Sequence, residues 1–141
     1  MPRALVLGYD DSPSAQAALT TAIELALRFG DRLVIAFAYA PPQRLVGEEF
    51  AEHRRALAEI GERVTATALD RARSEGVEAE VALVPERAAD ALVSLAAKHD
   101  ARLIVVGTYG ESPLKSAILG STPHRLLHLS QIPVLVVPAT A

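Results

Sequence analysis

The chain has 141 residues, half of them hydrophobic and 22% charged, which predicts one soluble globular domain over 1–141 rather than a disordered chain. The formal net charge of −3 argues against a nucleic-acid binder, because such proteins need a basic face to neutralise phosphates. The absence of cysteine excludes disulfides, cysteine-ligated metals and thiol nucleophiles.

The hydrophobic pattern, taken in chain order, alternates short apolar runs with longer segments of helical periodicity. The runs predict strands, and most are apolar at every position, as in parallel strands covered by helices on both faces. The expected elements are a strand at 5–9, a helix at 13–29, a strand at 33–39, a helix at about 48–74, a strand at 81–84 with 78 as its earliest start, a helix after Pro85, a strand at 103–106, a helix from about 121, and a strand at 134–137.

Two helix starts carry the same signal, a hydroxyl residue followed closely by proline. Ser12-Pro13 predicts a side-chain cap with proline at the first helical position, and Gly30 marks the end of that helix. Ser121-Thr122-Pro123 is interpreted in the same way, as a cap followed by proline.

This alternation predicts the fold class α/β, with an open parallel sheet of five strands in a single domain and helices on both faces. In such sheets ligands bind outside the carboxyl ends of the strands, where the winding reverses direction. The turns that follow the strands are therefore the place to look for functional residues.

The turn after the fourth predicted strand has an unusual spacing, G-x2-G-x9-G-S-T, formed by Gly107, Gly110, Gly120, Ser121 and Thr122. Glycine lets a ligand approach the backbone, and the free N–H groups at a helix start can bind a phosphate. The spacing is neither a Walker P-loop nor the G-x-G-x-x-G fingerprint. A purely structural interpretation remains open, because turn and cap glycines are common in α/β proteins.

This spacing occurs together with Tyr9-Asp10-Asp11-Ser12 after the first strand and with the closing segment Ile132-Pro133-Val134-Leu135-Val136-Val137. In combination they resemble the universal stress protein family in its nucleotide-binding branch, over essentially the whole chain. The resemblance implies an adenine nucleotide alpha hydrolase-like fold with strand order 3-2-1-4-5. It also implies ATP binding, with Mg possible beside ATP, and a cytoplasmic homodimer that serves stress-response signalling or sensing.

The resemblance also implies roles for particular residues. Asp10 matches an aspartate that approaches the adenosine, and Ala38 matches a small residue whose backbone faces adenine. The phosphate-binding segment is matched by Gly107, Gly110, Gly120, Ser121 and Thr122. A carboxylate that accepts a ribose hydroxyl is chemically sensible, since an ionised acceptor makes the stronger hydrogen bond. A helix-capping role for Asp10, beside Asp11 and Ser12, is the structural alternative.

The chain departs from the family pattern at Glu111 and Pro113, where many members have a basic residue and a glycine. A carboxylate beside a polyphosphate is repulsive, which favours AMP or cyclic AMP as the alternative ligand. Asp11, where the family commonly has glycine, is expected to add negative charge near the pocket.

Binding is expected rather than catalysis, with at most very slow ATP hydrolysis. No G-x-S-x-G elbow is present, and the sequence offers no clear base or magnesium ligand. His124 and His128 are spaced like two zinc ligands, but the glutamate of H-E-x-x-H is absent, so solvated helix residues and no metal site are expected.

The last strand, Val134–Val137, is followed by only four residues, so at a sheet edge it would be open to pairing. We therefore expect an isologous homodimer through this strand. A monomer whose edge is blunted by Pro133 and Pro138 is the alternative. A dimeric scaffold that binds no ligand is the alternative function, and the short apolar start of the chain predicts no membrane segment.

Overall fold

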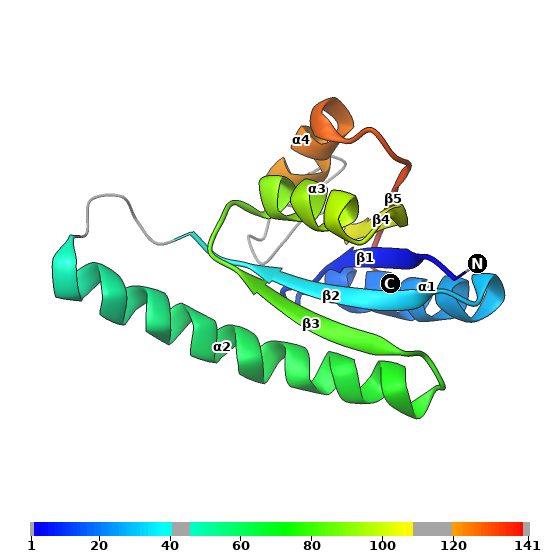
Figure 1. The fold of residues 1–141 in the computed structure, drawn as a ribbon, viewed down its shortest axis with the longest axis horizontal. Helices are drawn as coiled ribbons and strands as arrows, with labels where there is room; N and C mark the ends of the chain where they lie inside the picture. Colours follow the sequence, from blue (N-terminus) through cyan, green and yellow to red (C-terminus); the bar gives the residue numbers. More distant parts are fainter. Residues whose placement is uncertain (1, 41–45, 109–119, 140–141) are drawn as a thin grey trace.

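The computed structural model describes residues 2–40, 46–108 and 120–139. Its elements alternate along the chain as predicted (Figure 1). They are β1 (Ala4–Gly8), α1 (Pro13–Phe29), β2 (Arg32–Ala38), α2 (Gly47–Ser74), β3 (Ala79–Val84), α3 (Ala88–Lys98), β4 (Ala101–Gly107), α4 (Ser121–Leu129) and β5 (Val134–Val137). The strands form one parallel sheet in the order β3-β2-β1-β4-β5, which confirms the expected fold class and order.

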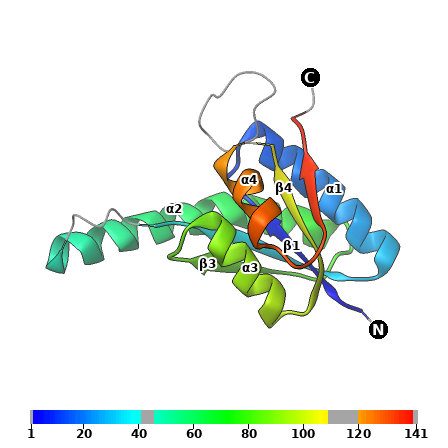
Figure 2. The same cartoon turned by 90° about the horizontal axis from the view of Figure 1, so that it is seen from above.

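Helices cover the sheet on both faces, and β5 lies at one edge (Figure 2). Successive strand residues point to opposite faces, so β1 supplies Leu5 and Leu7 to the core under α1 and α2, and Val6 to the core under α3 and α4. All three side chains are fully buried. The strands are apolar throughout because both faces are covered.

The start of α1 confirms the sequence interpretation. Ser12 is the N-cap, and its hydroxyl accepts a hydrogen bond from the Ala15 N–H at 3.2 Å. Pro13 is the first helical residue, where its missing N–H has no intrahelical partner to lose. Gly30 ends the helix in the left-handed conformation with φ +70.

The expected hydroxyl cap of α4, in Ser121-Thr122 before Pro123, is wrong. Gly120, not Ser121, is the N-cap, it makes no side-chain cap bond, and Pro123 is the third helical residue. The physical reason is that the Gly120 N–H donates to the Thr108 carbonyl at 2.7 Å, which fixes the entry of the chain earlier than the hydroxyl pattern indicates. The other observed boundaries differ from the expected ones by only a few residues, because the ends of helices and strands fray.

Helix α2 is the longest element, at 28 residues or about 42 Å, and its N-terminal part projects past the sheet (Figure 1). Its C-terminal half packs closely on β2, where a Cβ at Gly61 would lie 2.5 Å from Phe37 Cδ1. No helix in the described part of the chain is long and apolar enough to cross a membrane.

An ion pair ties together the amino end of the sheet. The carboxylate of Asp31 is fully buried and accepts hydrogen bonds from Arg102 Nε at 2.7 Å and from the Arg3 backbone N–H at 2.8 Å. The Arg102 guanidinium also lies 4.7 Å from the centre of the Phe29 ring. Hydrogen bonding to Arg102 is the main cause that lowers the pKa of Asp31.

Candidate functional site

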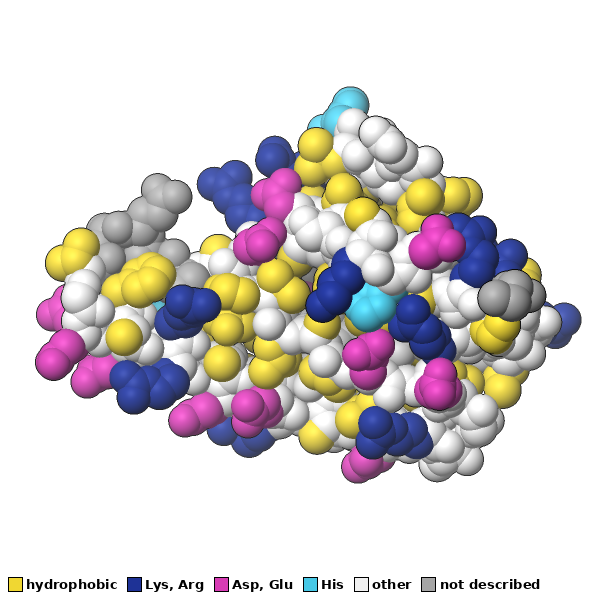
Figure 3. All heavy atoms as spheres, viewed as in Figure 1, with side chains coloured by type: hydrophobic (Ala, Val, Ile, Leu, Met, Phe, Trp, Pro, Cys, Tyr) yellow, Lys and Arg dark blue, Asp and Glu magenta, His cyan; other side chains and the backbone are white. Residues whose placement is uncertain are grey.

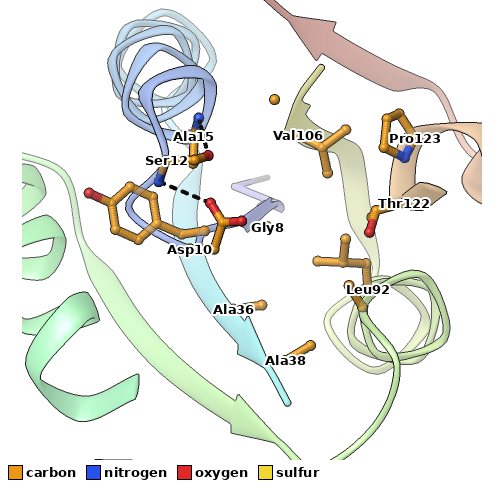
Figure 4. A pocket seen from close by; sticks show the side chains of 13 residues that line it. Gly8, Asp10, Ser12, Ala15, Ala36, Ala38, Leu92, Val106, Thr122 and Pro123 are labelled. Carbon is orange, nitrogen blue, oxygen red and sulfur yellow. Dashed lines mark hydrogen bonds between the residues drawn. The ribbon is translucent and has the colours of Figure 1, made fainter. Parts of the chain in front are cut away.

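A pocket opens at the carboxyl ends of β1, β2 and β4, at the opposite end of the sheet from Asp31 (Figure 4). The chain leaves β1 toward β2 on one side, whereas β4 lies on the other, so this is the switch point of the sheet. The cavity has a volume of about 130 Å³. Its described walls are Gly8, Tyr9, Asp10, Ser12, Ala15, Ala36, Ala38, Ala88, Leu92, Val106, Gly107, Thr122 and Pro123.

Asp10 lies in this pocket and also shapes the turn before α1. One carboxylate oxygen, Oδ1, accepts a hydrogen bond from the Ser12 N–H at 3.1 Å (Figure 4). The side chain is half-buried, and its other oxygen has no protein partner among the described residues. The capping geometry is therefore present, and it leaves one acceptor available to a ligand.

Asp11 is not among the residues that line the pocket, although its carboxylate bonds the hydroxyl of Tyr9, which does line it. Its backbone is left-handed with φ +64, the conformation in which glycine is unstrained. Its carboxylate accepts hydrogen bonds from the Tyr9 hydroxyl and from Gln16 Nε2, each at 3.0 Å. These two bonds explain how an aspartate is retained at a position that suits glycine.

Tyr9 stabilises the same turn through the hydrogen bond from its hydroxyl to Asp11. Its ring is buried, with 6% of the residue exposed, and its backbone N–H donates to the Ala36 carbonyl at 2.9 Å. Burial first, and then the hydrogen bond to Asp11, raises the pKa of Tyr9 to about 12. The phenol therefore stays neutral and keeps its donor role over the physiological pH range.

Gly107 lines the pocket, but packing also requires glycine there. A Cβ at this position would lie 2.2 Å from Ser14 Oγ and 2.7 Å from the Ser14 carbonyl carbon. The first turn of α1 therefore presses directly on the end of β4. The sequence pattern could not reveal this contact, because 93 residues separate the two positions in the chain.

The N-terminus of α4 contributes Thr122 and Pro123 to the wall. Helix starts usually offer several free N–H groups. Here the Gly120 N–H is bonded to Thr108, and Pro123 has no N–H, so within the described segments the Ser121 and Thr122 amides are left as donors toward an anion.

The predicted site residues are thus only partly brought together. Asp10, Ala38, Gly107 and Thr122 line the pocket, whereas Gly120 is buried and Ser121 is exposed beside it. Gly110 lies outside the described residues, as do Glu111 and Pro113.

Sequence reasoning missed the wall that α3 provides. Ala88 and Leu92 line the cavity from this helix, together with the small side chains of Ala36 and Ala38 on β2. Their helical spacing signals only a buried face, so the sequence offers no reason to separate them from ordinary core residues. Among the described lining residues Asp10 carries the only formal charge.

Fold and pocket together define a doubly wound α/β domain with a binding cavity at its switch point. The family model described as the universal stress protein family matches residues 1–138, and the chain belongs to that family. A universal stress protein from Thermus aquaticus is 36% identical, covering 97% of this chain and 99% of that protein.

Solved structures agree with this assignment. A protein of the universal stress family from Burkholderia pseudomallei is similar, with a TM-score of 0.78, 30% identity, and coverage of 97% of this chain and 96% of that one. A universal stress protein in complex with cAMP has a TM-score of 0.72 and 30% identity, covering 99% and 98% of the two chains.

Proposed function

We propose that this chain binds an adenine nucleotide in the switch-point pocket and acts as a nucleotide-responsive module in stress signalling. The observation that carries the proposal is an apolar slot, one available carboxylate oxygen and a helix N-terminus in a single cavity. The similar protein that binds cAMP supports it.

The base, the ribose and the phosphate of a nucleotide can each be assigned to a different part of the pocket wall. Ala36, Ala38 and Leu92 leave a narrow apolar space suited to a planar base. The free oxygen of Asp10 can accept a hydrogen bond from a ribose hydroxyl. The start of α4 then lies where the phosphate end would approach, and its dipole favours an anion.

The described donors favour a ligand with one phosphate. Among the described residues, two amides without a partner, those of Ser121 and Thr122, suit a single phosphate better than a triphosphate chain, and the described pocket wall carries a carboxylate but no cation. We therefore rank AMP and cyclic AMP above ATP, with or without Mg.

Calorimetric titration with ATP, AMP and cyclic AMP tests the proposal. We expect binding of all three, weakest for ATP, and at least tenfold weaker binding of every nucleotide to Asp10→Ala, because the ribose loses a charged acceptor. Asp11→Ala is the matched control, since it removes a neighbouring carboxylate that does not line the cavity. No heat and no thermal shift at millimolar nucleotide would favour the scaffold function instead.

We also propose that the module is a homodimer joined through β5. The Ile104 N–H donates to the Pro133 carbonyl and the Thr108 N–H to the Val137 carbonyl, both at 3.1 Å. Alternate residues of the strand thus face β4, which leaves the backbone groups of Val134 and Val136 directed at the outer edge.

That pattern fixes the register of a symmetric pair. Antiparallel strands related by a two-fold axis at Leu135 would bond Val134 of each chain to Val136 of the other, giving four hydrogen bonds. Among the described residues, no strand pairs with this edge.

A further inference from the structure

Two histidines form a pair on the outer side of α4, and neither is among the residues that line the pocket. His124 and His128 are four residues apart, so their side chains lie on the same helix face. Both are exposed, and their ring centres are 5.3 Å apart with an angle of 74° between the ring planes. Histidine side chains are visible at the tip of the molecule, over α4 (Figure 3).

The distance between the rings matches that of two imidazoles bound to one metal ion. A zinc–nitrogen bond of about 2.0–2.1 Å places each ring centre about 3 Å from the metal, so two rings at a tetrahedral angle have centres about 5 Å apart. The observed 5.3 Å is close to this value. Rotation of the side chains alone can then aim a nitrogen of each ring at a shared point, because the helix already sets the backbone spacing.

The surroundings leave the pair accessible to a cation. Arg125 lies between the two histidines in sequence, but its guanidinium is directed to Asp90 on α3, at 3.5 Å. In the described part of the chain neither imidazole has a hydrogen-bond partner, and no group of three or more potential metal ligands occurs. The pair would therefore supply two nitrogen ligands, with water in the remaining positions.

We propose that His124 and His128 chelate one divalent transition-metal ion of the Ni²⁺, Cu²⁺ and Zn²⁺ group. Imidazole suits these ions, and Cu²⁺ is expected to bind tightest. The ion would link successive turns of a nine-residue helix whose N-cap, Gly120, makes no side-chain cap bond. Binding would therefore stabilise α4, independently of whether a nucleotide occupies the pocket.

Calorimetry and thermal unfolding of the full chain without an affinity tag test this site, with CuCl2, NiCl2 and ZnCl2 as probes. We expect one ion per chain, tightest for Cu²⁺, and a rise in Tm with each metal. His124→Asn and His128→Asn should each weaken binding at least tenfold and abolish the rise in Tm. Both residues are exposed, so circular dichroism should show a retained fold.

His53→Asn is the matched control, because it removes one exposed imidazole from α2 and leaves the pair intact. It should bind metal like the unmodified chain. The proposal is overturned if the unmodified chain binds no metal at millimolar concentration, if either variant of the pair binds as tightly as the unmodified chain, or if His53→Asn loses binding equally.

Discussion

At the scale of single residues, the turn from Tyr9 to Ser12 shows how neighbouring carboxylates acquire different surroundings. Asp10 bonds its own turn and keeps one oxygen toward the cavity, whereas Asp11 is engaged by Tyr9 and Gln16. The sequence separates the two acids only through the family resemblance, which gives the ligand role to Asp10, and it does not predict the partners of the Asp11 carboxylate. The backbone at Asp11 is left-handed, and its carboxylate bonds Tyr9 and Gln16 and does not line the cavity.

Substitution of Asp11 separates backbone strain from hydrogen bonding. Asp11→Ala loses the bonds to Tyr9 and Gln16 and keeps a side chain in the left-handed conformation, whereas Asp11→Gly loses only the bonds. We expect the glycine variant to be more stable than the alanine variant by about 1 kcal/mol. Urea unfolding measures this, and equal stability of the two variants would contradict the strain argument.

The same substitution should change the titration of Tyr9. The pKa of Tyr9 is about 12, raised first by burial and then by Asp11, so Asp11→Gly should lower it toward the ordinary tyrosine value. Because the folded pKa is raised, the stability that this neutral phenol contributes is present below about pH 10 and is lost as pH rises toward 12. Tyrosinate absorbance, with Tyr9→Phe to identify the signal, provides the measurement.

Gly107 and Gly8 are a matched pair for testing the contact between α1 and β4. Gly107→Ala would place a Cβ 2.7 Å from the backbone of Ser14, so we expect a loss of about 1–3 kcal/mol in the free energy of unfolding. At Gly8 the nearest atoms are side-chain carbons of Leu92 and Val106 at 3.1 Å, which can shift. Chemical denaturation should therefore show a smaller loss for Gly8→Ala, and the reverse order would refute the packing argument.

At the scale of elements, the amino end of the sheet depends on one buried carboxylate between α1 and β2. No sequence pattern singles out Asp31, yet it binds Arg102 on β4 and the backbone of Arg3. Contacts across 71 and 28 positions of sequence are set by the strand order.

Asp31→Asn should destabilise the chain by about 2 kcal/mol near pH 7, because hydrogen bonds to a charged partner are lost. The pKa of Asp31 is lowered in the folded state, so its contribution is full above about pH 5 and is lost as pH falls through the folded pKa. Unfolding curves from pH 7 to acid should show the two proteins converging. A difference that does not depend on pH would contradict the ion-pair explanation.

At the scale of the whole molecule, the two ends of the sheet differ in structure. The amino end is closed by the Asp31 ion pair, whereas the carboxyl end is open at the pocket. The edge strand β5 runs between these ends, and its four residues are all half-buried within one chain. Pairing with the β5 strand of a second chain would bury these residues further. The proposed dimer interface therefore lies on the strand next to β4, and the carboxyl end of β4 lines the pocket.

Val136→Pro tests this edge. The Val136 N–H points outward in the parallel ladder, so proline should preserve the pairing with β4 and remove two of the four bonds expected between chains. We expect a dimer for the unmodified chain and a monomer for the variant in size-exclusion chromatography with light scattering. Val136→Thr keeps the N–H and should stay dimeric, and a monomeric unmodified chain would rule out the proposed pairing.

The sequence by itself determined the class of fold, the alternation of strands and helices, and the end of the sheet where the pocket lies. These follow from local hydrophobic patterns, from caps such as Ser12, and from a family motif that can be read without coordinates.

Only the tertiary structure decided which further residues meet Asp10, Ala38, Gly107 and Thr122 at the pocket. Leu92 of α3 lines the cavity with Ala38 of β2, Ser14 occupies the space beside Gly107, and the Thr108 carbonyl accepts a hydrogen bond from the Gly120 N–H at the start of α4. Such contacts join segments distant in the chain, so they depend on how helices and strands approach one another, and local patterns do not encode that approach.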